Sequence, residues 1–498
     1  MEYRWKAYSA IAVGSLMAAV DSTVVLLALF PIADGLHTDF VTVIWVVLAY
    51  LLVSTTFGIT LGRVGDLYGR RRMYLLGFAV FTVGSFLCGV APSGDSLVGF
   101  RVVQGIGAAL IMANSFALLS EAFPPADRGR AFGAIAVVWG VGSVLGIVVG
   151  GVIIAFTSWR WIFLINLPIG VAGTLWGARV LRPSPPRPAG APRPYFDLVG
   201  GGLFTAAITL LLFAVTWGLL YGWSTAVVLV SLVLSLGLFV AFALWEARAA
   251  RDPIIDPSFF RHRLFTASVL TAFLQSLALF SVNFLLLFYL EGIAGLSVLT
   301  ASYLILPVAV ASAVVGPAGG VLSDRIGPRI VATAGLLLQT VALVALITLT
   351  DSTPLYLVAV IEAVYGVGGG LFWPANTTAI MSATPPHRFG VGSGVMNTLR
   401  NTGMVMSFAL SLTAITAAIP ASIAYQLFVG TISGRLSPAD AQAYLHGQAL
   451  AFSVSLVLLV AAVILSLLRG PRGSPAGTEP LAPRPSGAPA VGPPSARR

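Results

Sequence analysis

Four ionisable side chains lie deep inside long apolar stretches of this sequence: Asp21, Arg101, Glu362 and Arg400. A bare charge surrounded by lipid is costly, so such groups should face a central cavity and find partners there. We predict that Asp21 is the main proton acceptor, with Arg101 as its counter-charge. We predict that the carboxylate of Glu362 is a second functional group, which binds a proton or a cationic substrate. The alternative is a static ion pair that locks two helices together.

Polar and aromatic side chains recur on the same apolar stretches. An apolar pocket with a few polar groups suits lipophilic or amphipathic molecules, and carboxylates within the membrane suit cations. Aromatic residues at helical spacing usually face lipid or a packed core instead, and Asn397 and Arg400 could equally satisfy backbone carbonyls. The predicted substrate-binding residues are Gln104, Asn114, Gln275, Asn283, Tyr365, Trp373, Asn376, Asn397 and Arg400.

Motifs for nucleotides and metals are missing from the sequence. A P-loop needs a lysine, and the only lysine is Lys6, near the start of the chain. The four histidines, His37, His262, His387 and His446, show no metal-ligand spacing. The sequence therefore predicts no cofactor, no metal and no catalytic residues. The rival class, a membrane enzyme, would need clustered nucleophiles, acids or metal ligands.

The composition is that of a protein embedded in a membrane. Hydrophobic residues make up 57% of the chain and charged residues only 9%, against about 25% charged in soluble domains. Apolar runs of about 20 residues, long enough to cross about 30 Å of hydrocarbon, recur throughout and predict helices. The fourteen predicted spans are residues 7–30, 43–61, 73–91, 97–122, 131–156, 161–181, 198–219, 224–246, 264–290, 298–320, 330–350, 355–382, 389–418 and 447–468.

The basic residues are sorted to one side of these fourteen spans. Of 28 Lys and Arg residues, 24 fall in the N-terminus, the C-terminal tail and every second loop. Only Arg160 and Arg435 fall on the other side, and Arg101 and Arg400 lie within spans. Cytoplasmic loops carry this excess of positive charge, so we predict that both termini are cytoplasmic. The same sorting argues against nucleic acid as the reason for the net charge of +10.

Two sequence patterns occur twice at nearly constant spacing. RVVQGIGAAL from Arg101 matches EAVYGVGGGL from Glu362, and GRVGDLYGRRR from Gly62 matches GVLSDRIGPRI from Gly320. The repeat predicts two bundles of six helices related by an axis along the membrane normal, with two helices inserted between them. The predicted parts are an N-terminal bundle at 1–181, cytoplasmic linkers and two inserted transmembrane helices at 182–263, a C-terminal bundle at 264–468 and a disordered cytoplasmic tail at 469–498.

Several motifs resemble one family. Gly62, Asp66, Gly69 and Arg70 match the loop signature of the major facilitator superfamily. Three further stretches resemble its fourteen-helix drug:proton antiporter branch, of the multidrug efflux type: residues 19–32, residues 158–170, and the motif within span 97–122 formed by Arg101, Gln104, Gly105 and Gly107. The resemblance implies an all-α polytopic membrane protein with the major facilitator fold and fourteen transmembrane helices.

The resemblance also implies roles for two groups of loop and helix residues. Asp66, with Gly62, Gly69 and Arg70, would form a latch for the outward-facing state, and Asp324 would be its counterpart. The alternative is that the arginines of this loop merely fix the topology. The family's antiporter motif is matched by helix-packing glycines at Gly142, Gly146, Gly150 and Gly151. One position departs from that motif, because Ile147 stands where the family has proline, which puts the direction of coupling in doubt.

The resemblance and the residues together predict a secondary active transporter of the cytoplasmic (inner) membrane. It would export lipophilic or cationic small molecules in exchange for protons by alternating access, as a multidrug efflux protein. The alternative is an exporter of lipid, lysolipid or an endogenous metabolite with the same fold. The predicted partners are protons, the substrate and membrane lipids, with no nucleic acid, and the protein is predicted to be a monomer.

Overall fold

The structure is a computed structural model that describes residues 2–183, 195–248, 253–255, 257–280, 282–296, 298–419 and 437–469. Within these residues the chain is helical, with short turns between the helices and no strand. Most of the predicted linker at 182–197 and nearly all of the predicted tail at 469–498 lie outside the described residues, as does Arg435.

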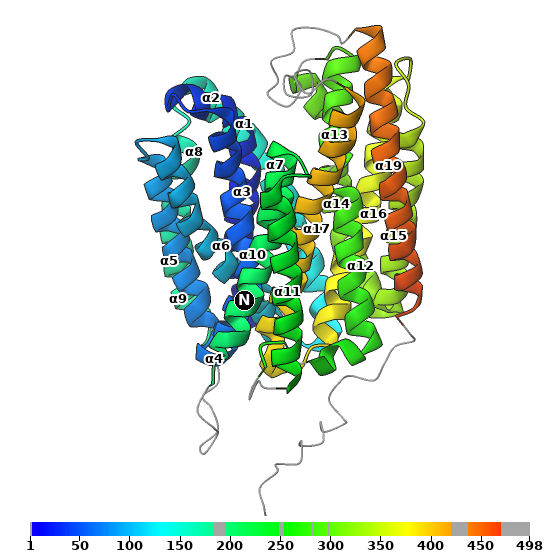
Figure 1. The fold of residues 1–498 in the computed structure, drawn as a ribbon. Coiled ribbons are helices and arrows are strands. Elements are labelled where there is room, and N and C mark those ends of the chain that lie inside the picture. The colour runs from blue at the N-terminus through cyan, green and yellow to red at the C-terminus, as the bar shows by residue number, and fades with distance from the viewer. Residues whose placement is uncertain are drawn as a thin grey trace, which may run out of the picture.

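The helices of the N-terminal half pack into one bundle (Figure 1). Glycine makes the turn between α4 and α5, since Gly69 joins these two helices at φ +105°, a conformation that a side chain would strain. The helices are α1 (Tyr3–Leu27), α2 (Leu29–Gly35), α3 (Phe40–Thr56), α4 (Gly58–Tyr68), α5 (Arg70–Gly89), α6 (Gly94–Ala122), α7 (Arg128–Phe156), α8 (Trp161–Leu164) and α9 (Asn166–Val180).

The helices of the C-terminal half form a second bundle beside the first (Figure 1). The matching turn of this half is made by Gly327 at φ +99°, as the internal repeat requires. The helices are α12 (Arg263–Leu279), α13 (Val282–Phe288), α14 (Val298–Ile326), α15 (Pro328–Ile347), α16 (Leu355–Ser382), α17 (Phe389–Ala418) and α19 (Pro438–Leu467).

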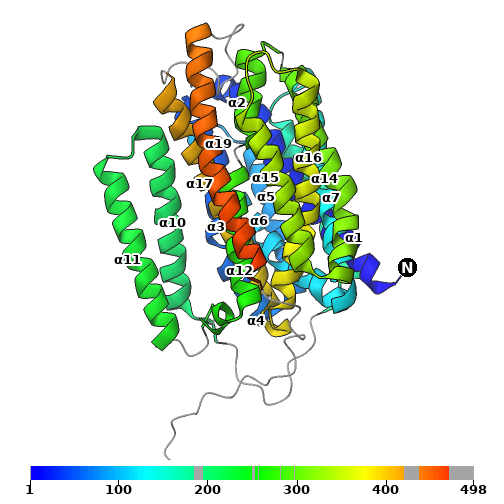
Figure 2. The same cartoon turned by 90° about the vertical axis from the view of Figure 1, so that its right-hand side faces the viewer.

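Two further helices, α10 (Leu198–Tyr221) and α11 (Ala226–Arg248), stand beside both bundles as a hairpin (Figure 2). The helix α10 packs against α3 of the first bundle and α17 of the second, while α11 is covered by α10 alone over most of its length. The exposed large hydrophobic side chains of α11 are all valine and leucine, which suit contact with lipid.

All fourteen predicted spans coincide with described helices. Within the described part of the chain, ten helices are long and apolar enough to cross a membrane, and α3 with α4, which meet at 46°, make an eleventh. The other three predicted spans fall on α7, on α12 with α13, and on α17.

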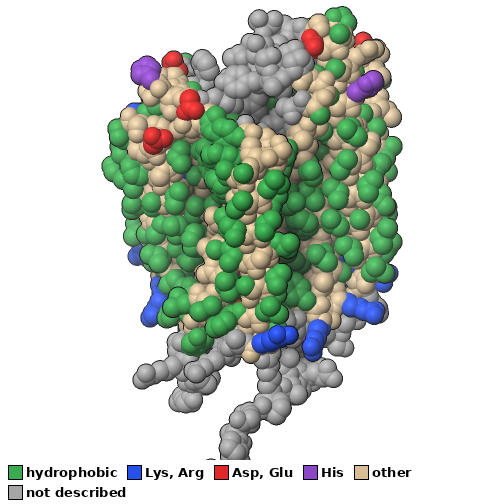
Figure 3. All heavy atoms as spheres, viewed as in Figure 1, with side chains coloured by type: hydrophobic (Ala, Val, Ile, Leu, Met, Phe, Trp, Pro, Cys, Tyr) green, Lys and Arg blue, Asp and Glu red, His purple; other side chains and the backbone are tan. Residues whose placement is uncertain are grey.

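The surface separates charge from apolar groups. On the face shown in Figure 3 a broad apolar belt crosses the molecule, Lys and Arg side chains gather at one end, and Asp, Glu and His side chains gather at the other. We call the first the arginine-rich end; it holds the junctions α4–α5, α6–α7, α14–α15 and α16–α17, with Arg70, Arg128 and Arg388. The belt is the surface expected of a protein whose solvent is hydrocarbon.

Close approach of glycines holds the two bundles together in the half of the molecule nearer the arginine-rich end. A Cβ on Gly62 would lie under 3.0 Å from the backbone of Gly390, and one on Gly320 would clash in the same way with Gly129. The contacts of Gly394 with Gly58, and of Gly133 with Gly316, are equally close. Adding 258 or 261 to the number of the first-bundle residue gives the matching residue of the second, so the repeat generates both sides of the interface.

The inserted hairpin is fastened at its arginine-rich end by Asp197. This carboxylate is 1% exposed; it caps α10 by accepting from the amide of Gly200 at 2.9 Å and binds the Trp245 indole nitrogen at 2.8 Å. Nearby, Arg388 of the second bundle donates to the carbonyl of Pro253 at 2.6 Å. These contacts join α10, α11 and the segment that leads into α12.

Replacing Asp197 with alanine should therefore destabilise the protein. The loss of a helix cap and of one buried hydrogen bond should lower the free energy of unfolding by about 2 kcal/mol. For a chain of this size that corresponds to a drop of roughly 2–4 °C in melting temperature. Thermal unfolding of purified protein measures it. Asp95→Ala is the control, because Asp95 is an exposed first-turn residue of α6; an equal drop there would contradict the assigned role of Asp197.

Candidate transport site

Asp21 lies at the centre of a polar network inside the N-terminal bundle. One carboxylate oxygen accepts from Arg101 at 2.9 Å, and the other accepts from Gln104 at 2.8 Å and from Asn166 at 3.1 Å. The side chain is 0% exposed, and that of Arg101 is 1% exposed. We expected Asp21 to face a central cavity; the structure instead turns it toward α6 and α9, because three donors there satisfy its charge.

The guanidinium of Arg101 is held on several sides. It donates to the carbonyl of Val46 on α3 at 3.0 Å and to Gln104 at 2.6 Å. Its centre lies 4.2 Å from the ring centroid of Tyr50 and 5.7 Å from that of Phe163. A buried charge is tolerated when a counter-charge and hydrogen bonds surround it in this way.

Two residues of the network, Asn166 and Ser85, were not predicted. Asn166 begins α9 and donates both to Asp21 and, at 3.0 Å, to the hydroxyl of Ser85 on α5. Ser85 in turn donates to the carbonyl of Phe163 at 2.9 Å. The signal in the sequence is that Asn166 lies in the stretch 158–170, which resembles the family, and that stretch does not indicate the partner of Asn166.

Glu362 is the unpaired carboxylate of the second bundle. It lies on α16 with 0% exposure, and neither of its oxygens accepts a hydrogen bond from a described residue. The nearby Tyr365 donates instead to the carbonyl of Leu279 at 3.1 Å. The internal repeat places Glu362 where the first bundle has Arg101, yet only the first bundle supplies a partner of opposite charge in the described chain.

The predicted latch residue Asp66 joins the two bundles. Its oxygens accept from the amides of Gly390 at 2.8 Å and Val391 at 3.0 Å, so it caps the first turn of α17. Arg70 binds the same carboxylate at 2.7 Å, donates to the carbonyl of Pro386 at 2.6 Å and pairs with Glu121. A negative charge at a helix N-terminus is favourable, and here it crosses the interface.

Asp324 makes the equivalent contact from the second bundle. It accepts from the amides of Gly129 and Arg130, both at 3.0 Å, and so caps the first turn of α7. The repeat puts Pro328 where the first bundle has Arg70, so the second latch has no arginine at this matching position.

The predicted helix-packing glycines of α7 separate into two groups. A Cβ on Gly142 or Gly146 would clash with α1, at Ala19 and Val20 respectively, so these two glycines allow α7 to approach the helix that carries Asp21. Gly150 is buried, whereas Gly151 has open space around it. The side chain of Ile147 lies outside the described residues.

Four of the predicted substrate residues are engaged inside the bundles. Gln104 belongs to the Asp21 network, Asn114 packs against Gly65, and Gln275 donates to Gln339 at 3.3 Å. Asn376 accepts from Arg469 at 2.5 Å. Asn283, on α13, is half-buried. A substrate role for these five residues stays a prediction.

Asn397, Trp373 and Arg400 lie where the two bundles meet. Asn397 donates to the carbonyl of Met112 in the first bundle at 3.4 Å. The guanidinium of Arg400 lies 5.4 Å from the ring centroid of Trp373 on α16 and 5.4 Å from that of Trp139 on α7. Trp139 was not predicted, because its apolar surroundings on α7 contain no charged residue to mark it.

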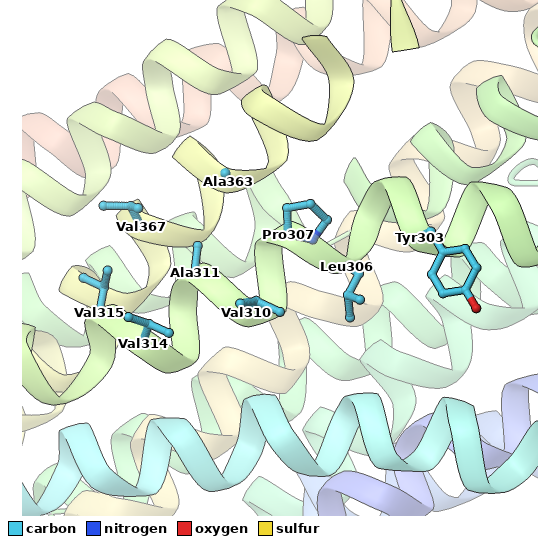
Figure 4. Close-up of a pocket in the computed structure, with 9 residues that line it drawn as sticks. All are labelled: Tyr303, Leu306, Pro307, Val310, Ala311, Val314, Val315, Ala363 and Val367. Carbon is cyan, nitrogen blue, oxygen red and sulfur yellow. The ribbon is translucent and has the colours of Figure 1, made fainter. Parts of the chain in front are cut away.

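An apolar groove with a volume of about 520 Å³ runs along α14 and α16 (Figure 4). Tyr303, Pro307 and Val310 of α14 line it, together with Ala363 and Val367 of α16. Its lining carries no charged side chain, so it suits apolar groups such as acyl chains. Among the described residues no cluster of His, Cys, Asp or Glu side chains could hold a metal ion.

Comparison with known proteins shows that the chain is similar to membrane transporters. Residues 11–408 match the Major Facilitator Superfamily. The riboflavin transporter RibZ of Clostridioides difficile is 31% identical over 92% of this chain and 98% of its own length. The multidrug resistance protein Stp of Mycobacterium tuberculosis is 33% identical over 80% of this chain and 73% of its own.

Similarity of fold extends to a sugar carrier. The structure of the proton:xylose symporter XylE superposes with a TM-score of 0.63 at 13% identity, covering 93% of this chain and 94% of that one. Two bundles of membrane-spanning helices, the loop signature around Asp66 and the family match lead to one identification. The chain belongs to the major facilitator superfamily and is an integral membrane transporter rather than an enzyme.

Proposed function

We propose that this protein exports lipophilic small molecules, cations among them, in exchange for protons by alternating access. The observation that carries the proposal is the ion pair of Asp21 with Arg101, buried in the membrane-spanning part of the first bundle. Such a pair is costly to keep inside a membrane, and ionisable residues there are by default functional.

Protonation of Asp21 supplies the coupling step. A proton on the carboxylate removes the charge that balances Arg101 and replaces one acceptor oxygen with a donor. The contacts from Arg101, Gln104 and Asn166 cannot then all persist, so α1, α6 and α9 must shift relative to one another. Movement of these helices opens a water path to Asp21 and so links the proton to the motion of the bundle.

The latches supply the second half of the cycle. Asp66 and Asp324 hold the bundles together at the arginine-rich end, which we assign to the cytoplasm on the basis of its charge. With this end closed, the protein can release substrate only toward the other side. Opening both latches exposes the interface to the cytoplasm, where substrate enters. We assign both termini to the cytoplasm and the protein to the inner membrane, as a monomer.

The names of the relatives favour efflux over uptake. Stp is named a multidrug resistance protein, which supports export of several lipophilic compounds. RibZ is named a riboflavin transporter, and it matches this chain over nearly its whole length. A planar heterocyclic metabolite is therefore the second candidate substrate. The predicted alternative of a lipid or lysolipid finds support only in the apolar groove along α14 and α16.

A vesicle assay tests the proposal. Inverted membrane vesicles that contain the protein should accumulate rhodamine 123 when their interior is made acidic, and collapse of the pH gradient should release the dye. The same vesicles are tested with riboflavin and with a fluorescent lysolipid. Accumulation of neither dye nor riboflavin, or accumulation that persists without a gradient, would contradict proton-driven export.

A further inference from the structure

We propose that Arg400, Trp139 and Trp373 form a binding site for the negatively charged group of an aromatic substrate. The inference rests on the proposed function in one respect, that the substrate of the transporter is a lipophilic small molecule. It names the class of substrate that this site selects, planar organic anions, which the carboxylates Asp21 and Glu362 do not favour.

The first argument is charge. No described carboxylate lies within ion-pair distance of Arg400, and its buried Nε has no hydrogen-bond partner among the described residues. Arginines inside a membrane normally pair with an acid or with backbone carbonyls. Removing a guanidinium from water without a partner costs several kcal/mol, and two aromatic faces return only about 0.5–2 kcal/mol each. The site therefore lacks one negative charge.

The second argument is position. Along α17, residues 389–398 are buried, and the first half-buried side chains are Leu399 and Arg400. One turn nearer the arginine-rich end, Thr398 donates to the carbonyl of Thr55 at 2.9 Å, and Asn397 reaches Met112 in the first bundle. Arg400 thus lies just beyond the buried stretch of α17 that contacts the first bundle, about 17 Å from the start of α17.

The third argument is that both bundles contribute. Trp139 belongs to α7 of the first bundle, whereas Trp373 and Arg400 belong to the second. Both tryptophans are half-buried, at the boundary between the two bundles. A flat aromatic molecule can stack on these rings while its anionic group pairs with the guanidinium. When the bundles rock apart, Trp139 moves away from Arg400 and the site is taken apart, which releases the substrate.

Direct binding tests the inference without any transport. Fluorescein and rhodamine 123 share a xanthene ring, but at neutral pH the first is an anion and the second a cation. Fluorescence polarisation with purified protein in gluconate buffer gives the dissociation constant of each dye. We expect the wild type to bind fluorescein more tightly, and Arg400→Gln to weaken fluorescein binding by about tenfold or more, the effect of one lost charged hydrogen bond. The affinity of the Arg400→Gln variant for rhodamine 123 should not fall.

Two further variants separate charge from folding. Arg400→Lys keeps the charge and should keep the preference for fluorescein, so it decides the matter if Arg400→Gln does not fold. Arg160→Gln is the matched control, because Arg160 also lies over a tryptophan, 4.5 Å from the ring centroid of Trp159, but contacts one bundle only. An equal loss of both dyes in Arg400→Gln, no preference in the wild type, or the same loss in Arg160→Gln would overturn the proposal.

The identity of the anion is decided by repeating the titration in chloride buffer. A preference for fluorescein that survives chloride supports an organic anion, whereas one that vanishes assigns the site to a small inorganic anion and overturns the proposal. Failure of the proposed function is distinguishable. Protein that binds fluorescein through Arg400 yet moves no dye across vesicles would contradict proton-driven export and leave this inference standing.

Discussion

Replacing Asp21 with asparagine should abolish proton-driven transport. Asparagine keeps the size of the side chain and one acceptor oxygen, which can serve Arg101 or Gln104 but not both, and it cannot take up a proton in the working range. We expect uptake of rhodamine 123 into acid-interior inverted vesicles to fall by at least about 100-fold, the range typical when a proton-transferring group is removed. Any residual flux should no longer depend on the pH difference.

The control is Asp34→Asn, which makes the same change at an exposed position of α2. It should transport at the wild-type rate. Because Asp21→Asn leaves the charge of Arg101 unbalanced, it is expected to cost about 3–5 kcal/mol of stability. Size-exclusion chromatography and dye binding must therefore show that the variant is folded. A folded Asp21→Asn protein that transports like the wild type would rule out Asp21 as the proton acceptor.

The fold was predictable because the membrane restricts the choices. Hydrocarbon forces the backbone into helices of a fixed length, so apolar runs of about 20 residues indicate the helices directly. The repeat of Gly62 and Asp66 at Gly320 and Asp324 then indicates two related bundles. The structure has helices at all these places, and the family match over residues 11–408 confirms the major facilitator assignment.

The surroundings of each site residue were less predictable. The sequence indicates that Asp21 and Arg101 need partners, but it does not show that α9 brings Asn166 to the same carboxylate. Counting about 1.5 Å per residue from the ends of the predicted spans would also place Arg400 and Glu362 in one layer of the membrane. In the structure Arg400 contacts Trp373, which lies about 11 residues from Glu362 along α16, so Arg400 and Glu362 lie at different depths. This separation is about 16 Å. The ends of a predicted span are uncertain, and a depth counted from such an end carries the same uncertainty.

The glycine contacts between the bundles could have been found from the repeat. Gly129 and Gly133 plus 261 give Gly390 and Gly394, and each pair follows a paired proline at the same distance. Their function depends on which helices cross, however, and no spacing in the sequence shows that α4 meets α17 while α14 meets α7. Once the crossing is known, the absence of a side chain at these positions has a direct physical reason, because the backbones touch there.

Replacing Gly62 with alanine should prevent the arginine-rich end from closing. The new Cβ would overlap the carbonyl of Gly390, so α17 must move away from α4. Asp66 would then lose its bonds to the amides of Gly390 and Val391. Two charge-assisted hydrogen bonds are worth about 3 kcal/mol together, which shifts the equilibrium between closed and open forms by about 100-fold. Transport should fall accordingly, since the closed form is a required step of the cycle.

The distance between spin labels at Tyr68 and Ile326, in a background without Cys88, measures this shift. Both positions are exposed and lie at the arginine-rich end, one on each bundle. The label distance should lengthen in Gly62→Ala and also in Gly129→Ala, where the Cβ would meet Gly320 and Asp324. Gly99→Ala is the matched control, because it puts alanine in a membrane-spanning helix with no atom within 4 Å of the new Cβ.

Comparing Gly62→Ala with Gly129→Ala tests whether the two repeated contacts contribute equally to closing the arginine-rich end. If Gly62→Ala and Gly129→Ala lengthen the distance equally, Asp66 and Asp324 act as one symmetric latch although only the first is bridged by Arg70. If Gly62→Ala has the larger effect, the arginine bridge makes the first latch dominant. Unchanged distances in both variants, with normal transport, would mean that the glycine contacts only pack the bundles and do not govern closure.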